Sequence, residues 1–450
     1  MITASHLPKD RNGLKIFTKN GGYTKSDISE LTTRAATIAR QFHASNTPIP
    51  NNPPTVPTVD FFPHYAGTLR DAILSEVCTT ISEIVEPFSD DECDVATYER
   101  PLAGLHIVLN AGHGSGALFH SVLEELGADV TGSIGVVPDE TFPNGVPNPE
   151  SKDMVFVTKR VCEEIGADIG VMLDTDADRS GFVLPREMTG SKEGGASGKY
   201  EALNGNRLIA LLGVVFKETA PGCTFVTDSV TSEGLSTFLE GLGIHHYRFV
   251  RGYANVIGKA MELDGKNGVD AQVAIETSGH CAMKENGYLD DGTYTAVRVI
   301  GFLARMLRLS KEPVSLLDLI NDMEEMEIAR EVRLTANNGD IETTRDAFEL
   351  CEKAIDAMCQ KGAGWELDNE NREGIRVRTS GGQDGSFFMI RCSLHDPVLS
   401  LYMEGSSISQ VKEKVVGPLL KMFKEDDFVR EALDISLLED LATSADYSLV

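Results

Sequence analysis

Short apolar runs and stretches of helical apolar spacing alternate along the first two thirds of the chain. The apolar runs predict strands, which we expect at 105–109, 169–173, 181–184, 224–227, 247–250 and 273–275. Apolar residues three or four positions apart predict helices, which we expect at 28–42, 68–84, 117–126, 208–216 and 233–241. Strands that alternate with helices in this way are typical of α/β domains.

From about Glu325 the pattern becomes that of an α+β domain. We expect strands there at 329–334, 375–379, 386–393 and 399–404, a helix at 344–361, and an acidic helix and tail at 425–450. Ser407 is expected to cap a further helix, and Ser26 with Asp27 to cap the first one. The Pro/Asn-rich stretch 44–63 predicts an exposed loop, and 89–94 an acidic linker.

A chain of 450 residues is too long for one hydrophobic core. The pattern divides it at 1–100, 101–206, 207–324 and 325–450. We therefore expect three α/β domains followed by a smaller α+β domain.

The charge composition constrains the partners. A formal net charge of −28 disfavours nucleic acid and anionic membranes as partners. An anionic substrate must then be held by a few local basic groups. No apolar run is long enough to span a bilayer, and residue 1 is not followed by a signal or transit pattern.

The eight cysteines are scattered and include no CxxC pair. This pattern predicts neither a zinc ribbon nor a disulfide framework, and a reducing compartment fits best.

The most informative stretch is the loop Asp174-Thr175-Asp176-Ala177-Asp178-Arg179, which separates two expected strands. Alternate carboxylates at the end of a strand can converge on one point, and carboxylate oxygens are the ligands that Mg²⁺ prefers. A solvated acidic turn is the alternative. The mutual repulsion of the carboxylates and the buried run before them favour the metal site.

A serine near the start of the chain is a second candidate. Ser5 and His6 lie in a polar loop with Lys9, Arg11 and Lys15 close behind, where basic neighbours can stabilise an added phosphate. An ordinary capping serine is the alternative.

Two further loops carry polar groups after expected strands. Glu276, Ser278 and His280 offer hydrogen bonds to sugar hydroxyls, with Lys284 available for a phosphate. The stretch 376–382, RVRTSGG, combines guanidinium, hydroxyl and backbone N–H groups and is a candidate phosphate-binding loop or a plain glycine hairpin. The glycine turn at 110–116 lacks the order of a nucleotide loop and is interpreted as structural.

Taken in order, these stretches resemble the α-D-phosphohexomutase family, which includes phosphoglucomutase, phosphomannomutase and phosphoglucosamine mutase. TASHLPKDRNGLK is similar to its TASHNPxxxNGxK phosphoserine loop, DTDADR to its DGDADR magnesium loop, and ETSGH to its GExSGH sugar-specificity loop. RTSGGQDG stands where the family has an RxSGTEP-type phosphate-binding loop. The resemblance runs from residue 1 to about Glu404.

The resemblance implies three related α/β domains and a fourth α+β domain that each give one loop to a central cleft. It also implies an isomerase of the phosphotransferase type, which moves phosphate from phospho-Ser5 to a hexose phosphate and takes the other phosphate back from a 1,6-bisphosphate. One Mg²⁺ per chain, a glucose 1,6-bisphosphate-type activator, a hexose phosphate substrate and a monomer or homodimer are expected on the same ground.

The roles of the site residues follow from the resemblance as well. Ser5, Asp174, Asp176 and Asp178 would hold Mg²⁺, Lys15 or His6 would be the general acid or base, and Arg179 is counted with the catalytic residues. Glu276, Ser278 and His280 would contact the sugar. The phosphate that is not transferred would be held by Arg378, Ser380, Gly381, Gly382, Lys284 and Arg391.

The chain departs from the family pattern at three places. Leu7 replaces the usual Asn, the fourth-domain loop reads GGQDG rather than GTEP, and Met1 lies inside the serine motif. We therefore expect a first domain that is incomplete at its N-terminus, from an incomplete gene model or a short isoform. A cytoplasmic location is the default, with a plastid possible if a transit peptide lies upstream.

Two other functions are compatible with parts of the pattern. A haloacid-dehalogenase-like phosphatase would use Asp174 as its nucleophile, but it leaves the TASH and ETSGH stretches without roles. A non-catalytic protein that binds sugar phosphates would result if the shortened first domain left Ser5 out of position. ETSGH is compatible with glucose, mannose and glucosamine phosphates.

Overall fold

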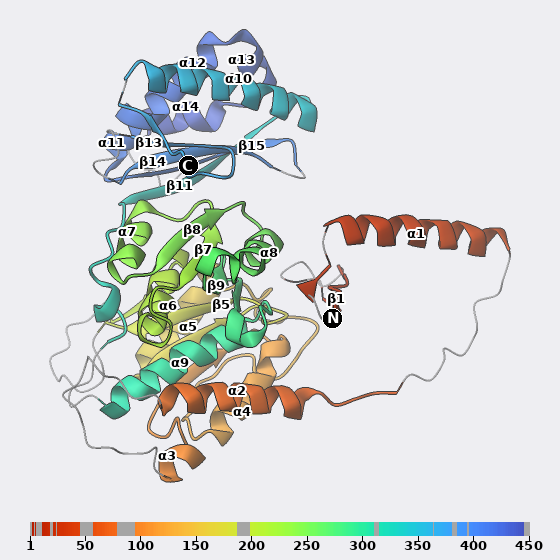
Figure 1. Cartoon of the computed structure of the whole chain (residues 1–450), viewed down its shortest axis with the longest axis vertical. Coiled ribbons are helices and arrows are strands. Elements are labelled where there is room, and N and C mark those ends of the chain that lie inside the picture. The colour runs from red at the N-terminus through yellow and green to blue at the C-terminus, as the bar shows by residue number, and fades with distance from the viewer. Residues whose placement is uncertain are drawn as a thin grey trace. The chain divides into compact units, whose positions relative to one another are not determined.

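The chain forms two compact units, one made of Met1–Thr219 with Ser278–Leu319 and the other of Ala220–Thr277 with Ile320–Val450. We call them unit 1 and unit 2. The computed structural model (Figure 1) describes residues 2–3, 5, 11–18, 21–23, 25–45, 57–78, 95–186, 199–309, 315–362, 364–379, 385–393 and 396–444. The division into four domains stays a prediction.

Unit 1 is built on a sheet of the strands β3 (Ile107–Asn110), β4 (Ile169–Leu173), β5 (Ser180–Pro185) and β6 (Tyr200–Ala202), in that order. β3 and β4 are parallel, whereas β5 pairs antiparallel with both β4 and β6. Every residue of β3 and β4 is buried. Strands covered on both faces read as continuous apolar runs, which is why the sequence predicted these strands correctly.

The helices of unit 1 differ from the prediction mainly at their ends. They are α1 (Lys25–Ala44), α2 (Phe62–Val77), α3 (Val95–Glu99), the 3₁₀ turn η1 (Ser115–Leu118), α4 (Phe119–Glu125), α5 (Lys152–Ile165), α6 (Gly205–Thr219), the 3₁₀ turn η3 (Lys284–Asn286) and α9 (Gly292–Leu309). α1 begins before Ser26, so Ser26 and Asp27 lie in its first turn and do not cap it. α2 begins inside the predicted loop, because Pro63 is tolerated in a first turn. Residues 79–84 of its predicted end lie outside the described residues.

The helix α9 was missed by the sequence analysis. It is buried almost all round, yet its apolar residues recur at helical spacing, so the sequence held a signal that was overlooked. The Asp291 carboxylate accepts a hydrogen bond from the Tyr294 backbone N–H at 2.9 Å, which is the geometry of an N-terminal cap. α9 packs against α2 (Figure 1), and Glu76 of α2 forms ion pairs with Arg298 and Arg305 of α9.

Unit 2 contains a parallel group of strands, β7 (Thr224–Asp228), β8 (His245–Phe249) and β9 (Ala271–Ile275), in which β7 pairs with both others. Helix α7 (Glu233–Gly241) has the predicted bounds, and Ser232 caps it by accepting a hydrogen bond from the Leu235 N–H. Helix α8 (Tyr253–Leu263) was not predicted. The strands expected around 224–227, 247–250 and 273–275 are confirmed.

The second part of unit 2 is a five-stranded antiparallel sheet covered by helices. The strand order is β11 (Ile328–Thr335), β15 (Val398–Gly405), β14 (Phe387–Cys392), β13 (Ile375–Arg378) and β12 (Glu366–Leu367). The helices are α10 (Ile341–Gln360), α11 (Ile408–Val411), the π-helical stretch Lys412–Val416, α12 (Gly417–Glu425), α13 (Asp427–Ala432) and α14 (Ser436–Thr443). Ser407 caps α11 as predicted, with its hydroxyl accepting from the Gln410 N–H. The predicted α+β pattern is confirmed.

The remaining short elements are the hairpin β1 (Phe17–Thr18) with β2 (Gly21–Gly22), the strand β10 (Cys281–Met283), and the 3₁₀ turns η2 (Lys266–Gly268) and η4 (Asp318–Ile320). Among the described residues, no helix combines the length and the apolar character needed to cross a bilayer.

One cysteine contradicts the expectation of reduced thiols. Cys78 is disulfide-bonded, whereas six other cysteines are free, four of them buried. A disulfide depends on the distance between two chain segments in the fold, which spacing along the sequence does not give.

Candidate functional site

The Asp174–Arg179 loop, which we call the acidic loop, lies between β4 and β5 and has a compact, left-handed turn. The Ala177 N–H donates to the Asp174 carbonyl at 3.2 Å, and Ala177 has a φ of 60°. The loop also contacts the glycine turn after β3, since the Ser115 N–H donates to the Thr175 carbonyl at 2.9 Å. A Cβ on Gly114 would lie 2.6 Å from that same carbonyl oxygen. The glycine turn therefore supports the acidic loop, which agrees with its structural interpretation.

Asp174 is fully buried at the start of the loop. Its two carboxylate oxygens accept from Arg179, Oδ1 from the backbone N–H at 3.1 Å and Oδ2 from Nε at 2.9 Å. Burial, together with the charge of Asp178, raises the pKa of Asp174 to about 7, although Arg179 opposes both effects. Arg179 therefore also fixes the shape of the loop.

The N-terminal stretch 3–15, which we call the serine loop, contacts the acidic loop through Thr3 and Lys15. Lys15 Nζ lies 3.0 Å from Asp176 Oδ2 and also contacts Asp178 Oδ2. The Thr3 hydroxyl donates to Asp176 Oδ2 at 2.8 Å, and Thr3 Oγ1 accepts from the Ser5 N–H at 2.8 Å. Two segments more than 150 residues apart in sequence are thus brought together, with Ser5 one hydrogen bond away from the side chain that holds Asp176.

The geometry of the serine loop depends on two backbone features. Ser5 has a φ of 52°, which is uncommon for a residue with a side chain. The Thr3 N–H donates to the Gly13 carbonyl at 3.1 Å, and a Cβ on Gly13 would lie 2.8 Å from the Thr3 carbonyl oxygen. The loop closes on itself this tightly because residue 13 is a glycine.

The acidic loop has the properties of a cation site. Oxygens of Asp174, Asp176 and Asp178 lie within 4.8 Å of one another. Asp176 Oδ1 and Asp178 Oδ1 are buried and have no hydrogen-bond partner among the described residues. Unpartnered buried carboxylate oxygens are costly unless a cation binds them. These three residues therefore fit a hard divalent cation such as Mg²⁺.

The pKa shifts in the loop follow from the same charges. Burial would raise the pKa of Asp176, but the ammonium group of Lys15 outweighs it, and the pKa is lowered. Burial would in turn lower the pKa of Lys15, whereas Asp178 and Asp176 raise it well above its ordinary value. Lys15 is therefore a firmly protonated cation between two carboxylates as long as nothing else neutralises them.

The turn after β9 places His280 against the acidic loop, and both belong to unit 1. Arg179 and His280 form an antiparallel bridge, and a Cβ on Gly279 would lie 2.9 Å from the Ser180 carbonyl oxygen. His280 Nδ1 lies 2.8 Å from Asp290 Oδ2 and 3.7 Å from Asp178 Oδ1. Ser278 is half-buried in this turn, and Lys284 begins the 3₁₀ turn η3.

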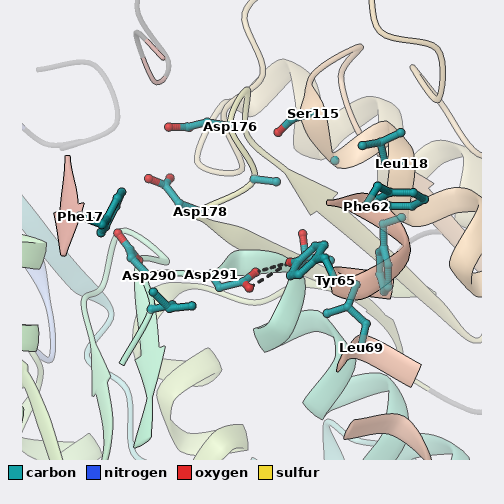
Figure 2. Close-up of a pocket in the computed structure, with 15 residues that line it drawn as sticks. Phe17, Phe62, Tyr65, Leu69, Ser115, Leu118, Asp176, Asp178, Asp290 and Asp291 are labelled. Carbon is teal, nitrogen blue, oxygen red and sulfur yellow. Dashed lines mark hydrogen bonds between the residues drawn. The ribbon is translucent and has the colours of Figure 1, made fainter. Parts of the chain in front are cut away.

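A cavity of about 320 Å³ adjoins the acidic loop within unit 1, and Figure 2 shows the side chains around it. Its walls are mostly apolar and come from α2, the η1 and α4 segment and the loop before α9. Asp176 and Asp178 lie at one side of it, and Tyr65 donates to both oxygens of Asp291 at 2.9 Å. The sequence analysis missed Asp290 and Asp291. An aspartate before an apolar run is a helix-start signal that would have drawn attention to both residues.

Three of the candidate residues lie in unit 2. Glu276 is 5% exposed, and its Oε1 accepts from the Gly252 N–H at 2.6 Å. Arg378 lies 3.5 Å from Glu233 and 3.2 Å from Asp368. Arg391 forms ion pairs with Glu331, at 3.4 Å, and with Glu373, at 3.9 Å. His6, Ser380, Gly381 and Gly382 lie outside the described residues.

Arg378 belongs to an arginine cluster in which Arg248, Arg376 and Arg378 surround the carboxylates Glu233 and Asp368. Arg376 is 1% exposed and donates to the backbone carbonyls of Ser229 and Thr231. Arg376 is thus a structural residue, whereas Arg378 keeps a partly exposed side chain (27%). The cluster has one more cation than anion, which suits an anionic ligand.

Comparisons with known proteins agree with the motifs. Residues 87–188 match the model of phosphoglucomutase/phosphomannomutase, alpha/beta/alpha domain II, and residues 204–326 match that of domain III. A phosphomannomutase/phosphoglucomutase from Pseudomonas putida is 26% identical over 94% of this chain and 77% of its own. A phosphoglucosamine mutase from Rhodospirillum rubrum is 30% identical over 75% of this chain and 64% of its own, so the chain spans less than two thirds of that relative.

Solved structures share the fold. A phosphoglucomutase/phosphomannomutase family protein from Burkholderia thailandensis superposes with a TM-score of 0.65 at 21% identity, over 94% of this chain and 75% of its own. An N-acetylphosphoglucosamine mutase from Aspergillus fumigatus, solved in complex with GlcNAc-6P and magnesium, has a TM-score of 0.52 at 15% identity, over 92% of this chain and 86% of its own. At these identities the likeness concerns the fold alone.

Proposed function

Because this chain belongs to the α-D-phosphohexomutase family, we propose that it interconverts hexose 1-phosphates and hexose 6-phosphates through a phosphorylated Ser5. The observation that carries the proposal is the meeting of the serine loop with the acidic loop, through Lys15 and Thr3 on one side and Asp176 and Asp178 on the other. A phosphoryl carrier needs a hydroxyl beside positive charge, which Lys15 and a cation bound to the three aspartates would supply.

In the proposed reaction, phospho-Ser5 gives its phosphoryl group to the free hydroxyl of a hexose phosphate. The Ser5 Oγ–P bond breaks as the sugar O–P bond forms, and the sugar hydroxyl loses its proton. The resulting 1,6-bisphosphate then returns its other phosphate to Ser5. Lys15 or His6 acts as the acid and base at the sugar oxygen, and the cationic side chain of Lys15 balances charge on the transferring group.

Mg²⁺ fits the carboxylate oxygens of Asp174, Asp176 and Asp178 with Ser5, and it would neutralise charge on the phosphoserine. Arg179 holds Asp174 in place for that role, through the two hydrogen bonds described above. The magnesium in the Aspergillus fumigatus structure supports this choice of metal.

The remaining residues bind the substrate in this proposal. Glu276, Ser278 and His280 contact sugar hydroxyls, and a phosphate that is not being transferred is held by Arg378, Ser380, Gly381, Gly382, Lys284 and Arg391. The relatives act on mannose, glucose and glucosamine phosphates, as their names say, so a hexose phosphate is the substrate class that we propose. A glucose 1,6-bisphosphate-type activator would phosphorylate Ser5 at the start.

The alternative phosphatase function is disfavoured by the position of Asp174. A nucleophile has to reach the phosphorus atom, whereas Asp174 is 0% exposed and both of its oxygens accept hydrogen bonds from Arg179. A non-catalytic sugar-phosphate-binding protein is the other alternative, and it is separated from the mutase by an activity measurement.

We would assay the full chain with Mg²⁺, a trace of glucose 1,6-bisphosphate and the 1-phosphates of glucose, mannose, glucosamine and N-acetylglucosamine, and follow the 6-phosphates by ³¹P NMR. The proposal expects turnover of at least one substrate and its loss in Ser5→Ala. Release of inorganic phosphate that depends on Asp174, or binding of all four without turnover, would overturn it.

A further inference from the structure

A second cluster of metal-ligand atoms lies beside the acidic loop in unit 1. Asp178, His280 and Asp290 each offer one ligand atom, and these atoms lie within 4.8 Å of one another. Asp178 Oδ1, which also counts toward the three-aspartate site, lies 3.7 Å from His280 Nδ1, whereas Lys15 contacts Asp178 Oδ2. The Asp178 carboxylate therefore belongs to both groups of ligand atoms.

The chemistry of this cluster differs from that of the three aspartates. Imidazole nitrogen is a ligand for Zn²⁺ and similar transition metals, whereas Mg²⁺ prefers oxygen ligands alone. One histidine with two carboxylates gives three protein ligands and leaves a fourth position open, as in zinc sites that keep a water or a substrate. His280 Nδ1 is hydrogen-bonded to Asp290 Oδ2 at 2.8 Å and lies 3.7 Å from Asp178 Oδ1, so a bound cation would take the place of the proton in that hydrogen bond.

Two buried oxygens point to a missing ligand. Asp178 Oδ1 and Asp290 Oδ1 have no hydrogen-bond partner among the described residues. The side chains of Asp178 and Asp290 are only 4% and 8% exposed. A single imidazole cannot satisfy two carboxylates in a buried position, since its Nδ1 donates at most one hydrogen. A divalent cation would satisfy both.

We propose that Asp178, His280 and Asp290 form a second metal site, selective for Zn²⁺-class ions over Mg²⁺, with Asp178 bridging it to the aspartate site. The inference goes beyond the proposed function, because it concerns metal binding and holds whether or not the chain turns over a sugar phosphate. A carboxylate shared by two cations also predicts that filling one site changes the affinity of the other.

The test is a calorimetric titration of Zn²⁺ into the full chain in the presence of excess Mg²⁺. We expect one equivalent of Zn²⁺ to bind although Mg²⁺ is saturating. His280→Ala and Asp290→Asn should each weaken this binding by roughly 100-fold, because each removes one of three ligands. Asp176→Asn should weaken Mg²⁺ binding and, in titrations without Mg²⁺, leave Zn²⁺ binding nearly intact. His43→Ala, at an exposed position of α1, is the matched histidine control.

A measurement on the unaltered chain covers the case in which a variant fails to fold. X-ray absorption at the zinc edge of the Mg²⁺- and Zn²⁺-loaded protein should show nitrogen and oxygen neighbours with the outer-shell scattering of one imidazole. Zinc bound through sulfur, displacement of Zn²⁺ by Mg²⁺, or Zn²⁺ affinity unchanged in both His280→Ala and Asp290→Asn would overturn the proposal.

Discussion

Each unit buries a cluster of charged side chains, and the two clusters have opposite surpluses of charge. The acidic loop of unit 1 has three aspartates against Lys15 and Arg179, and two of its buried oxygens lack partners among the described residues. The arginine cluster of unit 2 has three arginines against Glu233 and Asp368. The first surplus suits a cation and the second an anion, as a magnesium site and a phosphate site require.

The clusters also differ in how much the fold depends on them. Arg376 donates to backbone carbonyls of a neighbouring loop, so it holds chain segments together. The acidic loop instead rests on backbone contacts from Gly114 and Gly292. The carboxylates of Asp176 and Asp178 each keep one oxygen without a hydrogen-bond partner among the described residues, where an ion can bind. We therefore expect substitutions in the first cluster to change activity and those in the second to change stability.

The largest effect is expected for Lys15→Met. The variant removes the cation between Asp176 and Asp178, and with it the proposed acid and base, so mutase activity should fall by roughly 10²–10⁴-fold. With Mg²⁺ bound to the same carboxylates, the free energy of unfolding should change little. The matched control is Lys259→Met, because Lys259 pairs with Glu262 along α8 and lies outside both clusters. A large loss of stability in Lys15→Met would contradict the expected difference between the two clusters.

Arg376→Met should act in the opposite way. It leaves the buried Asp368 and the partly buried Glu233 short of one partner, and it removes the contact of the guanidinium with the Phe387 ring, whose centroid is 3.4 Å away. Breaking a buried ion pair costs about 3–5 kcal/mol, which a denaturant titration can measure. The control Arg430→Met removes an exposed pair with Asp427 and an exposed hydrogen bond to the Lys424 carbonyl, and it should cost less than about 1 kcal/mol.

Glu404 gives a pH dependence in unit 2. Burial raises the pKa of Glu404 to about 7 from 4.5, and the hydrogen bond from the Tyr402 hydroxyl opposes this shift. Because the folded-state pKa lies above the unfolded one, the native state prefers the protonated acid, and this group destabilises the fold as pH rises from 4.5 to 7.

Glu404→Gln imitates the protonated acid, so its stability relative to the unaltered chain should rise over that window by about 3 kcal/mol. Unfolding titrations at pH 5 and pH 8 measure the difference, with the exposed Glu413→Gln as control. A difference that falls with pH would contradict the assignment.

Gly292→Ala tests the backbone support of the acidic loop. A Cβ at this position would lie 2.5–2.7 Å from backbone atoms of Arg179, whereas a Cβ on Gly258 of α8 would meet nothing within 4 Å. We expect Mg²⁺ affinity, measured by calorimetry, to fall about tenfold in Gly292→Ala because the loop must shift. Gly258→Ala should leave Mg²⁺ binding unchanged and raise stability by about 0.5–1 kcal/mol. Equal Mg²⁺ affinity in both variants would show that Gly292 does not support the loop.

The sequence predicted the parts of the molecule that depend on neighbours along the chain. β4 and the acidic loop were recognised because a buried run of apolar residues ends in alternate aspartates. The bounds of α7 were predicted as well, since Ser232 is a local cap signal. The fold class followed from these elements and from the motifs.

Features that depend on burial in three dimensions were missed. The disulfide of Cys78 leaves no signal in the spacing of cysteines, whereas α9 was overlooked although its apolar residues recur at helical spacing. The partnership of His280 with Asp290 needs the fold of the turn that joins them. Arg376 and Arg378 looked equivalent in sequence, yet burial separates a structural arginine from a partly exposed one.

The central claim is that the serine loop and the acidic loop together carry a phosphoryl group. Its most direct test is to incubate the chain with Mg²⁺ and glucose 1,6-bisphosphate and to map phosphate by peptide mass spectrometry, with Asp176→Asn as the partner variant. The account predicts phosphate on Ser5, and much less of it in Asp176→Asn. Phosphate on Asp174, or no phosphate on any residue, would contradict it.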